Sequence, residues 1–408
     1  MSRPRIASRV SRIKPSPSTA AADRAAELRR TGRSIISLVV GEPDFDTPQA
    51  IRAAAESAIE AGATRYTAGA GTLELRQAIA AKLRRENGLD YTTSEIIVTA
   101  GAKSAIFSAL AATLEPGDEV LIPAPYWVSY PDMVLANDGT PVALPCPETQ
   151  GFKLTPAQLA AAITPRTRWL IVNSPSNPTG AIYTGAEYRA LAEILERHPD
   201  VMVMTDDIYE HIRFDGRRTE HLLEAVPALR DRTLAINGVS KTYAMTGWRI
   251  GWAAGPRDLI VALETLLSQS VGNCSAPGQA AAAFALNSDQ SFVAECVAIY
   301  RQRRDRTAQR INAIPGLRCL MPDGAFYLYV NCAGLIGHQT PQGTALASDE
   351  DVVMYLLEVA GVAVVAGSAY GLSPFFRLSI ATSIENLMDG CDRMADAVAA
   401  LGDVAAIR

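Results

Sequence analysis

One stretch decides the fold of this chain: Val239-Ser240-Lys241-Thr242-Tyr243-Ala244-Met245-Thr246-Gly247-Trp248-Arg249-Ile250-Gly251. It follows an apolar run, Thr233-Leu234-Ala235-Ile236, which predicts a buried strand that ends at Asn237-Gly238. A buried lysine is disfavoured as an ammonium ion, so the amine of Lys241 is easily left neutral and nucleophilic. A neutral amine can form a Schiff base with an aldehyde, while Ser240 and Arg249 offer a hydroxyl and a forked cation to a phosphate. The alternative is structural: a strand-end lysine beside a core tryptophan.

The composition is that of an ordinary globular protein. With 408 residues, 48% hydrophobic and 20% charged, the chain can form a large domain and a smaller one. A net charge of −5 without a basic stripe argues against nucleic acid, and no apolar run of about 18 residues predicts a membrane span. The six cysteines form no Cys-x-x-Cys pair and the four histidines lack metal-ligand spacing. We therefore expect reduced thiols, no metal site and a cytoplasmic location.

Strand and helix patterns alternate from about residue 96 to residue 236. Strands separated by helices predict a largely parallel sheet that is covered on both faces, with ligands at the carboxyl ends of its strands. A strand is also expected at residues 35–40, and Ser18 and Thr47 are expected to cap helices. We predict an N-terminal arm with part of a small domain (residues 1–45), a large domain (46–300) and a small α+β domain (301–408).

Two polar motifs follow predicted strands directly. Gly101-Ala102-Lys103 stands at a strand-to-helix junction, where free N–H groups and the helix dipole favour phosphate. In Asn173-Ser174-Pro175-Ser176-Asn177-Pro178-Thr179-Gly180, two prolines and a glycine define an extended loop that projects the amide of Asn177. An ordinary structural turn is the alternative for each motif.

Three further side chains have a chemical and a structural interpretation. Asp206, in Asp206-Asp207-Ile208-Tyr209, could keep a pyridine nitrogen protonated as an electron sink, whereas paired acids could instead bind magnesium. Trp127 could cover an aromatic ring with its flat face, or belong to the core. The guanidinium of Arg377 suits bidentate binding of a carboxylate, with a surface salt bridge as the alternative.

In this order the motifs resemble those of class I, fold-type I, pyridoxal-phosphate aminotransferases, from about Arg9 to the last helix. The resemblance implies a mostly parallel seven-stranded sheet sandwiched by helices, plus a smaller α+β domain. It also implies a homodimer with shared active sites, in which Lys241 holds pyridoxal 5′-phosphate as a Schiff base. The other cofactor contacts that it implies are Gly101, Ala102, Lys103, Trp127, Asn177, Asp206, Tyr209, Ser240 and Arg249, with Tyr66 reaching the phosphate of the neighbouring subunit.

Within this family the chain looks most like the bacterial aspartate aminotransferases of the Iβ branch. Lys14-Pro15-Ser16, the Gly-Ala-Lys loop and Ala-Met-Thr-Gly-Trp-Arg carry that likeness. It implies that the substrate is bound by Gly41 and Arg377 at the α-carboxylate and by Lys103 at the distal carboxylate, with contacts from Trp127, Asn177 and Ser18. Ser18, where relatives often have threonine, and residues 271–275 depart from the family pattern, and both departures leave the donor open.

The expected reaction is ping-pong transamination of an amino acid, most directly L-aspartate. 2-Oxoglutarate, glyoxylate and prephenate are the candidate acceptors. One alternative is a lyase or decarboxylase on the same fold, because a Schiff base can promote the breaking of any Cα bond. Another is a non-catalytic regulatory protein, which would carry a DNA-binding helix-turn-helix region for which we expect no spare length. Intact Lys241 and Arg377 favour catalysis.

Overall fold

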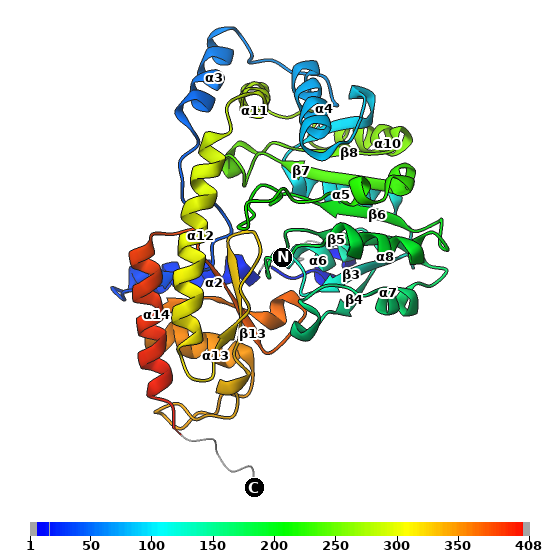
Figure 1. Ribbon diagram of the computed structural model, residues 1–408. Helices are drawn as coiled ribbons and strands as arrows, with labels where there is room; N and C mark the ends of the chain where they lie inside the picture. Colours follow the sequence, from blue (N-terminus) through cyan, green and yellow to red (C-terminus); the bar gives the residue numbers. More distant parts are fainter. Residues whose placement is uncertain (1–5, 16, 403–408) are drawn as a thin grey trace, which may run out of the picture.

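A seven-stranded sheet organises the larger part of the molecule (Figure 1). The computed structural model describes residues 6–15 and 17–402. The strand order is β2-β8-β7-β6-β5-β3-β4, and only β8 runs against its neighbours. The mostly parallel sheet is therefore confirmed. Its strands are β2 (Ile96–Thr99), β3 (Glu119–Ala124), β4 (Thr140–Pro145), β5 (Thr167–Asn173), β6 (Met202–Asp206), β7 (Thr233–Gly238) and β8 (Gly251–Ala254).

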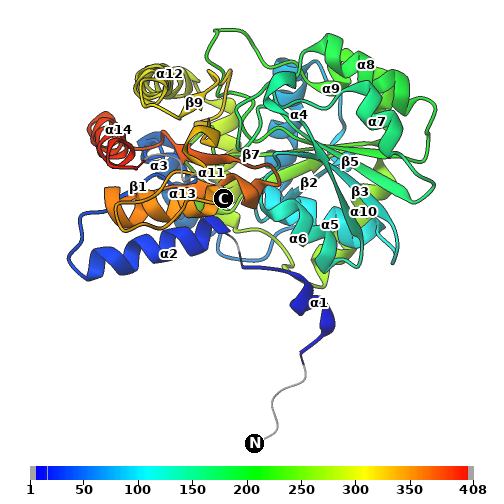
Figure 2. The same ribbon diagram turned by 90° about the horizontal axis from the view of Figure 1, so that it is seen from below.

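Helices cover both faces of this sheet because successive strand residues point to opposite sides. Ile97 and Met204 pack with α5 (Ala102–Thr113), α6 (Ser129–Ala136) and α10 (Arg257–Ser268). Their neighbours Ile96 and Val203 pack on the other face, and Figure 2 shows the sheet between the two helical layers. The elements of this second layer include α4 (Leu73–Asn87), α7 (Pro156–Ala162), α8 (Gly185–Leu195), α9 (Leu222–Ala225) and α11 (Ala276–Asn287).

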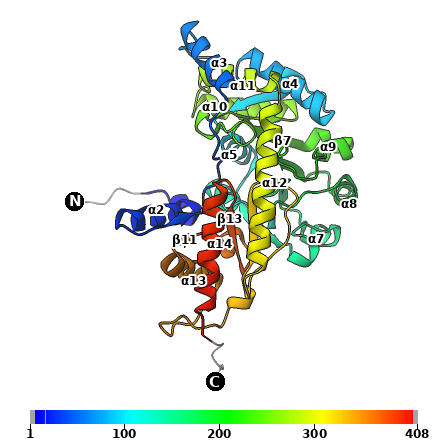
Figure 3. The ribbon, with the colours of Figure 1, turned by 60° about the vertical axis from the view of Figure 1, so that its left-hand side comes forward.

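The second core is built around a smaller antiparallel sheet of order β12-β13-β10-β9. The long helix α12 (Ser291–Asn312) and α14 (Ile384–Ala399) lie side by side against it, as Figure 3 shows. β1 pairs in parallel with β11 as a separate ribbon. The elements of this part are β1 (Ile36–Ser37), β9 (Arg318–Cys319), β10 (Tyr327–Asn331), α13 (Asp349–Tyr355) with the π-helical turn η6 (Leu356–Ala360), β11 (Val362–Ala363), β12 (Val365–Ala366) and β13 (Phe375–Ser379).

The remaining helices join these two parts or flank them. α1 (Ser8–Arg12) contacts α6, and α3 (Gln49–Glu60) packs on α11. α2 (Pro17–Arg30) lies against β11 and β12. In the described part of the chain, no helix combines the length and the apolar character that crossing a bilayer requires. The three-way domain division stays a prediction.

Three local expectations were wrong. The strand expected at residues 35–40 is only Ile36–Ser37, because β11 pairs with it over just two residues. Thr47 does not cap α3: its hydroxyl donates to the carbonyl of Ala244 (2.6 Å), and α3 begins after Pro48. Ser18 lies inside α2, which begins at Pro17, so it is not the capping residue. The side chain of Ser18 lies outside the described residues.

Candidate functional site

A cavity of about 320 Å³ lies where the strands of the large sheet end at their carboxyl edge. It brings together eleven of the residues predicted from the sequence. They come from the end of β6, from segments that follow β1, β2, β3, β5, β6 and β7, and from β13 of the second core. These residues are Gly41, Ala102, Lys103, Trp127, Asn177, Asp206, Tyr209, Ser240, Lys241, Arg249 and Arg377.

Lys241 reaches the cavity three residues after β7 ends. Its Nζ donates a hydrogen bond to the carbonyl oxygen of Gly41 (2.5 Å). Burial lowers the pKa of its ammonium group to about 8, because removing water disfavours the charged form. Near pH 8 a substantial fraction of this amine is therefore neutral and able to attack a carbonyl carbon.

Asp206, the last residue of β6, is a buried carboxylate that points into the same cavity. Its Oδ2 accepts a hydrogen bond from the hydroxyl of Tyr130 (2.6 Å), and Oδ1 accepts one from the N–H of Ile208 (3.4 Å). Burial raises the pKa of Asp206 to about 6, although the bond from Tyr130 opposes this. A cationic ring nitrogen would relieve that burial penalty by pairing with the carboxylate.

Arg249 and the start of α5 form the cationic end of the cavity. The guanidinium donates to the carbonyl oxygens of Thr246 (2.9 Å) and Ala100 (3.0 Å). Gly101 has a φ of +86°, and a Cβ there would lie 2.5 Å from Nη2 of Arg249. The glycine is thus required for the close approach of Arg249 to the N–H groups that begin α5. Such a helix start with an adjoining arginine is an anion-binding arrangement.

Arg377 lies in β13 and is almost completely buried. Its Nη1 donates to Oδ1 of Asn177 (3.0 Å) and its Nη2 to the carbonyl of Val39 (2.6 Å), while the guanidinium lies 4.4 Å from the ring centroid of Tyr327. Its Nε is buried and finds no acceptor in the part of the chain that the structure describes. A buried donor without a partner favours an anionic ligand at this end of the cavity.

Asn177 is held beside Arg377 by a residue of its own motif, and Tyr209 by a residue that the sequence motifs did not include. The N–H of Asn177 donates to Oδ1 of Asn173 (2.8 Å). The hydroxyls of Tyr209 and Tyr327 are 2.8 Å apart. Tyr327 and Tyr130 therefore belong to the site architecture. No sequence signal singles them out, because each looks like an ordinary aromatic residue of a strand or helix.

Two predicted site residues, Tyr66 and Gly101, stand apart from the cavity lining, and the side chain of Ser18 lies outside the described residues. Tyr66 is 97% exposed within this chain. Gly101 lies behind Arg249 rather than on the cavity wall. Residues 271–275, which depart from the family pattern, connect α10 to α11, and Val271 is exposed. The cavity of one chain is therefore lined by most of the predicted site residues, whereas Tyr66 lies outside it.

Comparison with known proteins agrees with this arrangement. Residues 33–394 match the family model for aminotransferase class I and II. An aspartate aminotransferase of Rhizobium meliloti strain 1021 is 51% identical over 391 residues, which are 96% of this chain and 95% of that protein. An aspartate/prephenate aminotransferase of Cereibacter sphaeroides is 52% identical over 385 residues, 94% of this chain and 96% of that protein.

Solved structures agree with the sequence relatives. The crystal structure of an aspartate aminotransferase from Rhizobium meliloti superposes with a TM-score of 0.96 at 51% identity, covering 98% of this chain and 100% of the other. An aspartate aminotransferase from Thermus thermophilus, solved with maleate, gives a TM-score of 0.90 at 40% identity and covers 97% and 100%. The likeness extends through both the large sheet and the second core, and the chain therefore belongs to the class I and II aminotransferases.

Proposed function

We propose that this aminotransferase uses pyridoxal 5′-phosphate to move the amino group of L-aspartate to a 2-oxo acid by a ping-pong cycle. The observation that carries this proposal is Lys241. Its amine, with a lowered pKa, faces the same cavity as the buried carboxylate of Asp206 and the guanidinium of Arg377. 2-Oxoglutarate, glyoxylate and prephenate are the acceptors that we propose to compare.

The residues present fit this cofactor at each of its polar ends. Arg249, Ser240 and the start of α5 would hold the phosphate, and Asp206 would pair with the ring nitrogen. Asn177 and Tyr209 would donate to the phenolic oxygen, and Trp127 would cover the ring. When bound, pyridoxal phosphate supplies an aldehyde for amines and a ring that accepts electrons from Cα.

The side chains of this chain then perform the proton transfers and the binding. Lys241 would hold the cofactor through its amine and, once a substrate amine has displaced it, would take up the proton from the substrate Cα as a general base and later return it as a general acid. Arg377 and the main chain at Gly41 would fix the α-carboxylate in the cavity that Lys241 also lines. A Cβ at position 41 would lie 2.8 Å from the hydroxyl of Tyr327, so glycine is needed for the main chain to lie this close to Tyr327.

A half-reaction separates this proposal from a lyase or decarboxylase. Aspartate added without an acceptor should convert the bound cofactor stoichiometrically to its amine form and then stop. The absorbance of the protein and the release of oxaloacetate would follow this conversion. Continuous release of ammonia, carbon dioxide or pyruvate under the same conditions would contradict the proposal and support the lyase or decarboxylase.

Arg377 should be needed for every donor, because each amino acid carries an α-carboxylate. Lysine at this position keeps the charge but loses the fork that also binds Asn177. We expect Arg377→Lys to raise the KM of aspartate, alanine and aromatic donors alike, by roughly ten- to a hundredfold. Arg166→Lys is the matched control, since Arg166 binds Glu119 with two nitrogens away from the cavity. An effect confined to one donor would exclude Arg377 from α-carboxylate binding.

Lys103 should instead select acidic donors. Its side chain lines the cavity while keeping contact with solvent, and its Nζ lies 4.8 Å from the ring centroid of Trp127. Partial loss of water, and then the nearby charge of Arg249, lower the pKa of Lys103. We expect Lys103→Ala to weaken aspartate by about 1.5–3 kcal/mol and to leave alanine nearly unchanged.

Steady-state kinetics on aspartate and alanine side by side would measure this difference. Lys103→Arg, which retains a cation, should recover part of the preference for aspartate. If Lys103 serves only the phosphate, the alanine variant would lose cofactor affinity and weaken all donors equally. That result would remove Lys103 from substrate selection.

We also propose a homodimer in the cytoplasm with shared active sites. Tyr66 supports this, because an aromatic side chain that is 97% exposed in one chain is available to contact the phosphate of a second copy. Sedimentation of the purified protein would measure its mass, and Tyr66→Phe should weaken cofactor binding without changing that mass.

A further inference from the structure

An ionic cluster centred on the buried residues Lys82 and Glu210 adjoins the turn that carries Lys241. Its members are Lys82 and Glu86 of α4, and Glu210 and His211 of the segment that follows β6. The side chain of Lys82 is 1% exposed and pairs with the carboxylate of Glu210. Its Nζ also donates to Oδ1 of Asn87 (2.8 Å) and lies 3.6 Å from Oε2 of Glu86.

Glu210 accepts hydrogen bonds from three side chains of two different elements, α4 and β7. Besides Lys82, it accepts from the amide of Asn87 (2.9 Å) and from the amide of Asn237 (2.5 Å), at the end of β7. Burial by itself would raise its pKa, but the charge of Lys82 and the hydrogen bonds from Lys82 and Asn87 lower the pKa of Glu210 below its ordinary value. This carboxylate is therefore an anion that orients Asn237.

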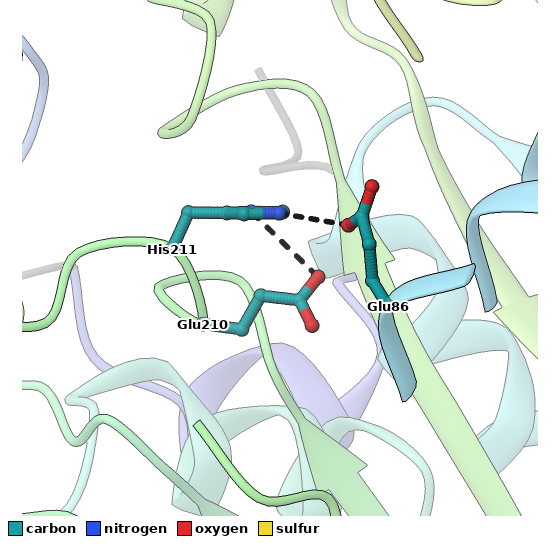
Figure 4. Close-up of side chains that lie close together, drawn as sticks. All are labelled: Glu86, Glu210 and His211. Atoms are coloured by element: carbon teal, nitrogen blue, oxygen red, sulfur yellow. Dashed lines mark hydrogen bonds and ion pairs between the residues drawn. The ribbon is translucent and has the colours of Figure 1, made fainter. Parts of the chain in front are cut away.

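His211 connects the cluster to the residue after Lys241. Figure 4 shows its ring beside the carboxylates of Glu86 and Glu210. Nε2 lies 2.9 Å from Oε2 of Glu86, and Nδ1 lies 3.1 Å from Oγ1 of Thr242. Because an ionised carboxylate only accepts hydrogen bonds, a neutral ring carries its proton on Nε2, and the hydroxyl of Thr242 then donates to Nδ1.

The cluster therefore contacts both ends of the turn that carries Lys241. Asn237 precedes this turn and Thr242 follows it, and both side chains are buried. The segment that provides Glu210 and His211 also carries Asp206 and Tyr209 into the cavity. The cluster therefore connects the turn that carries Lys241, the segment that carries Asp206 and Tyr209, and helix α4.

Glu86, Glu210 and His211 could also form a metal site, since one ligand atom from each lies within 4.8 Å of the others. The ammonium group of Lys82 already lies against Glu210 and near Glu86, where such an ion would bind. A divalent cation there would meet a like charge at short range. The geometry favours Lys82 as the cation of this cluster.

Burying such charges is a poor way to gain stability, because the cost of removing water offsets most of the attraction. Buried ionic groups are better known for holding neighbouring side chains in one specific arrangement. We propose that this cluster positions Lys241, with His211 acting through Thr242 and Glu210 acting through Asn237. The inference rests on the proposed function of Lys241 in binding pyridoxal phosphate, and it makes His211 a positioning residue.

Thr242→Val tests the proposal because it removes one hydroxyl and keeps the branched shape of the side chain. We expect kcat for aspartate to fall roughly tenfold while KM changes by less than about twofold, since the lysine is misplaced but the substrate contacts remain. Thr242→Ser, which restores the hydroxyl, should recover most of the rate. His211→Gln should give a similar split between kcat and KM.

A second measurement uses the protein without cofactor. Acylation of Lys241 by a small anhydride, located by mass spectrometry at several pH values, reports the pH at which its amine becomes neutral. A loosened and more hydrated lysine should titrate at higher pH in Thr242→Val, with a shift of roughly half a unit or more. A purely structural role for Thr242 would leave this midpoint unchanged.

The matched control is Thr233→Val, at the opposite end of β7. Thr233 is fully buried, and its hydroxyl donates to the carbonyl of Leu229 (2.8 Å). The Thr233→Val variant should lower thermal stability about as much as Thr242→Val, without changing kcat or the pH midpoint of acylation at Lys241. Equal kinetic effects from both threonine variants, or none from Thr242→Val, would overturn the proposal.

Two further results distinguish a failure of the proposed function from a failure of the positioning role. If borohydride fails to trap cofactor on Lys241 in the wild-type protein, the proposed function itself fails. If trapping succeeds but chelation of metal from the wild-type protein reproduces the kcat loss of Thr242→Val, the cluster is a metal site and the positioning proposal is wrong.

Discussion

Replacing Lys241 by alanine should lower the rate of transamination by roughly 10³-fold or more, because the group that moves the Cα proton is removed. The variant should still bind pyridoxal phosphate non-covalently. Arg249, Ser240 and Asp206 come from other positions of the cavity wall and remain in place. Single-turnover absorbance with aspartate would measure the rate, and dialysis would measure retention of the cofactor.

Chemical trapping of the bound cofactor identifies the lysine that holds it, without a measurement of turnover. Borohydride should fix the cofactor on Lys241 in the wild-type protein, and mass spectrometry of a digest should place the added mass there. Lys153→Ala is the matched control, because Lys153 pairs with Glu187 away from the cavity and its loss should leave trapping intact. Added mass on any other lysine would contradict the assignment.

Asp206→Ala should slow the half-reaction with aspartate by roughly 10²-fold or more, since the ring nitrogen loses the charge that keeps it protonated. The effect is expected to be large because Asp206 is buried, where an ion pair is weakly screened. Rapid mixing of the loaded protein with aspartate would measure it. An unchanged half-reaction would remove Asp206 from the site.

Tyr130→Phe makes a smaller change at the same carboxylate than Asp206→Ala does. It deletes the hydroxyl that donates to Oδ2 of Asp206 but leaves the carboxylate in place. We expect a loss of only about tenfold or less, because the carboxylate keeps its charge and its hydrogen bond from the N–H of Ile208. A larger loss from Tyr130→Phe than from Asp206→Ala would show that the tyrosine, and not the aspartate, carries the chemistry.

Element positions could be predicted well wherever local pattern and tertiary structure agree. The alternation of strands and helices that is expected from about residue 96 to residue 236 is observed from β2 to β7. The apolar residues of buried strands and the turn residues between them are local features that sequence periodicity reports directly. The same patterns predicted the sheet edge at which the polar residues meet.

Other features depended on partners distant in the sequence. β8 was not expected as a strand, because its Gly251-Trp252-Ala253-Ala254 becomes one only by pairing with β2 and β7. Thr47 has the sequence context of a helix cap, yet its hydroxyl bonds to Ala244, almost two hundred residues away. Long-range pairing overrode local preference in both cases.

The sequence by itself determined the family, the sheet and the chemical identity of the side chains in the cavity, because motifs of fixed type and spacing follow successive strands. Only the tertiary structure decided how those groups are held. Tyr130 reaches Asp206, Tyr327 reaches Tyr209, and His211 reaches Thr242, each through contacts between separate elements. Such contacts leave no periodicity in the chain, since they depend on how the elements pack and not on what neighbours each residue in sequence.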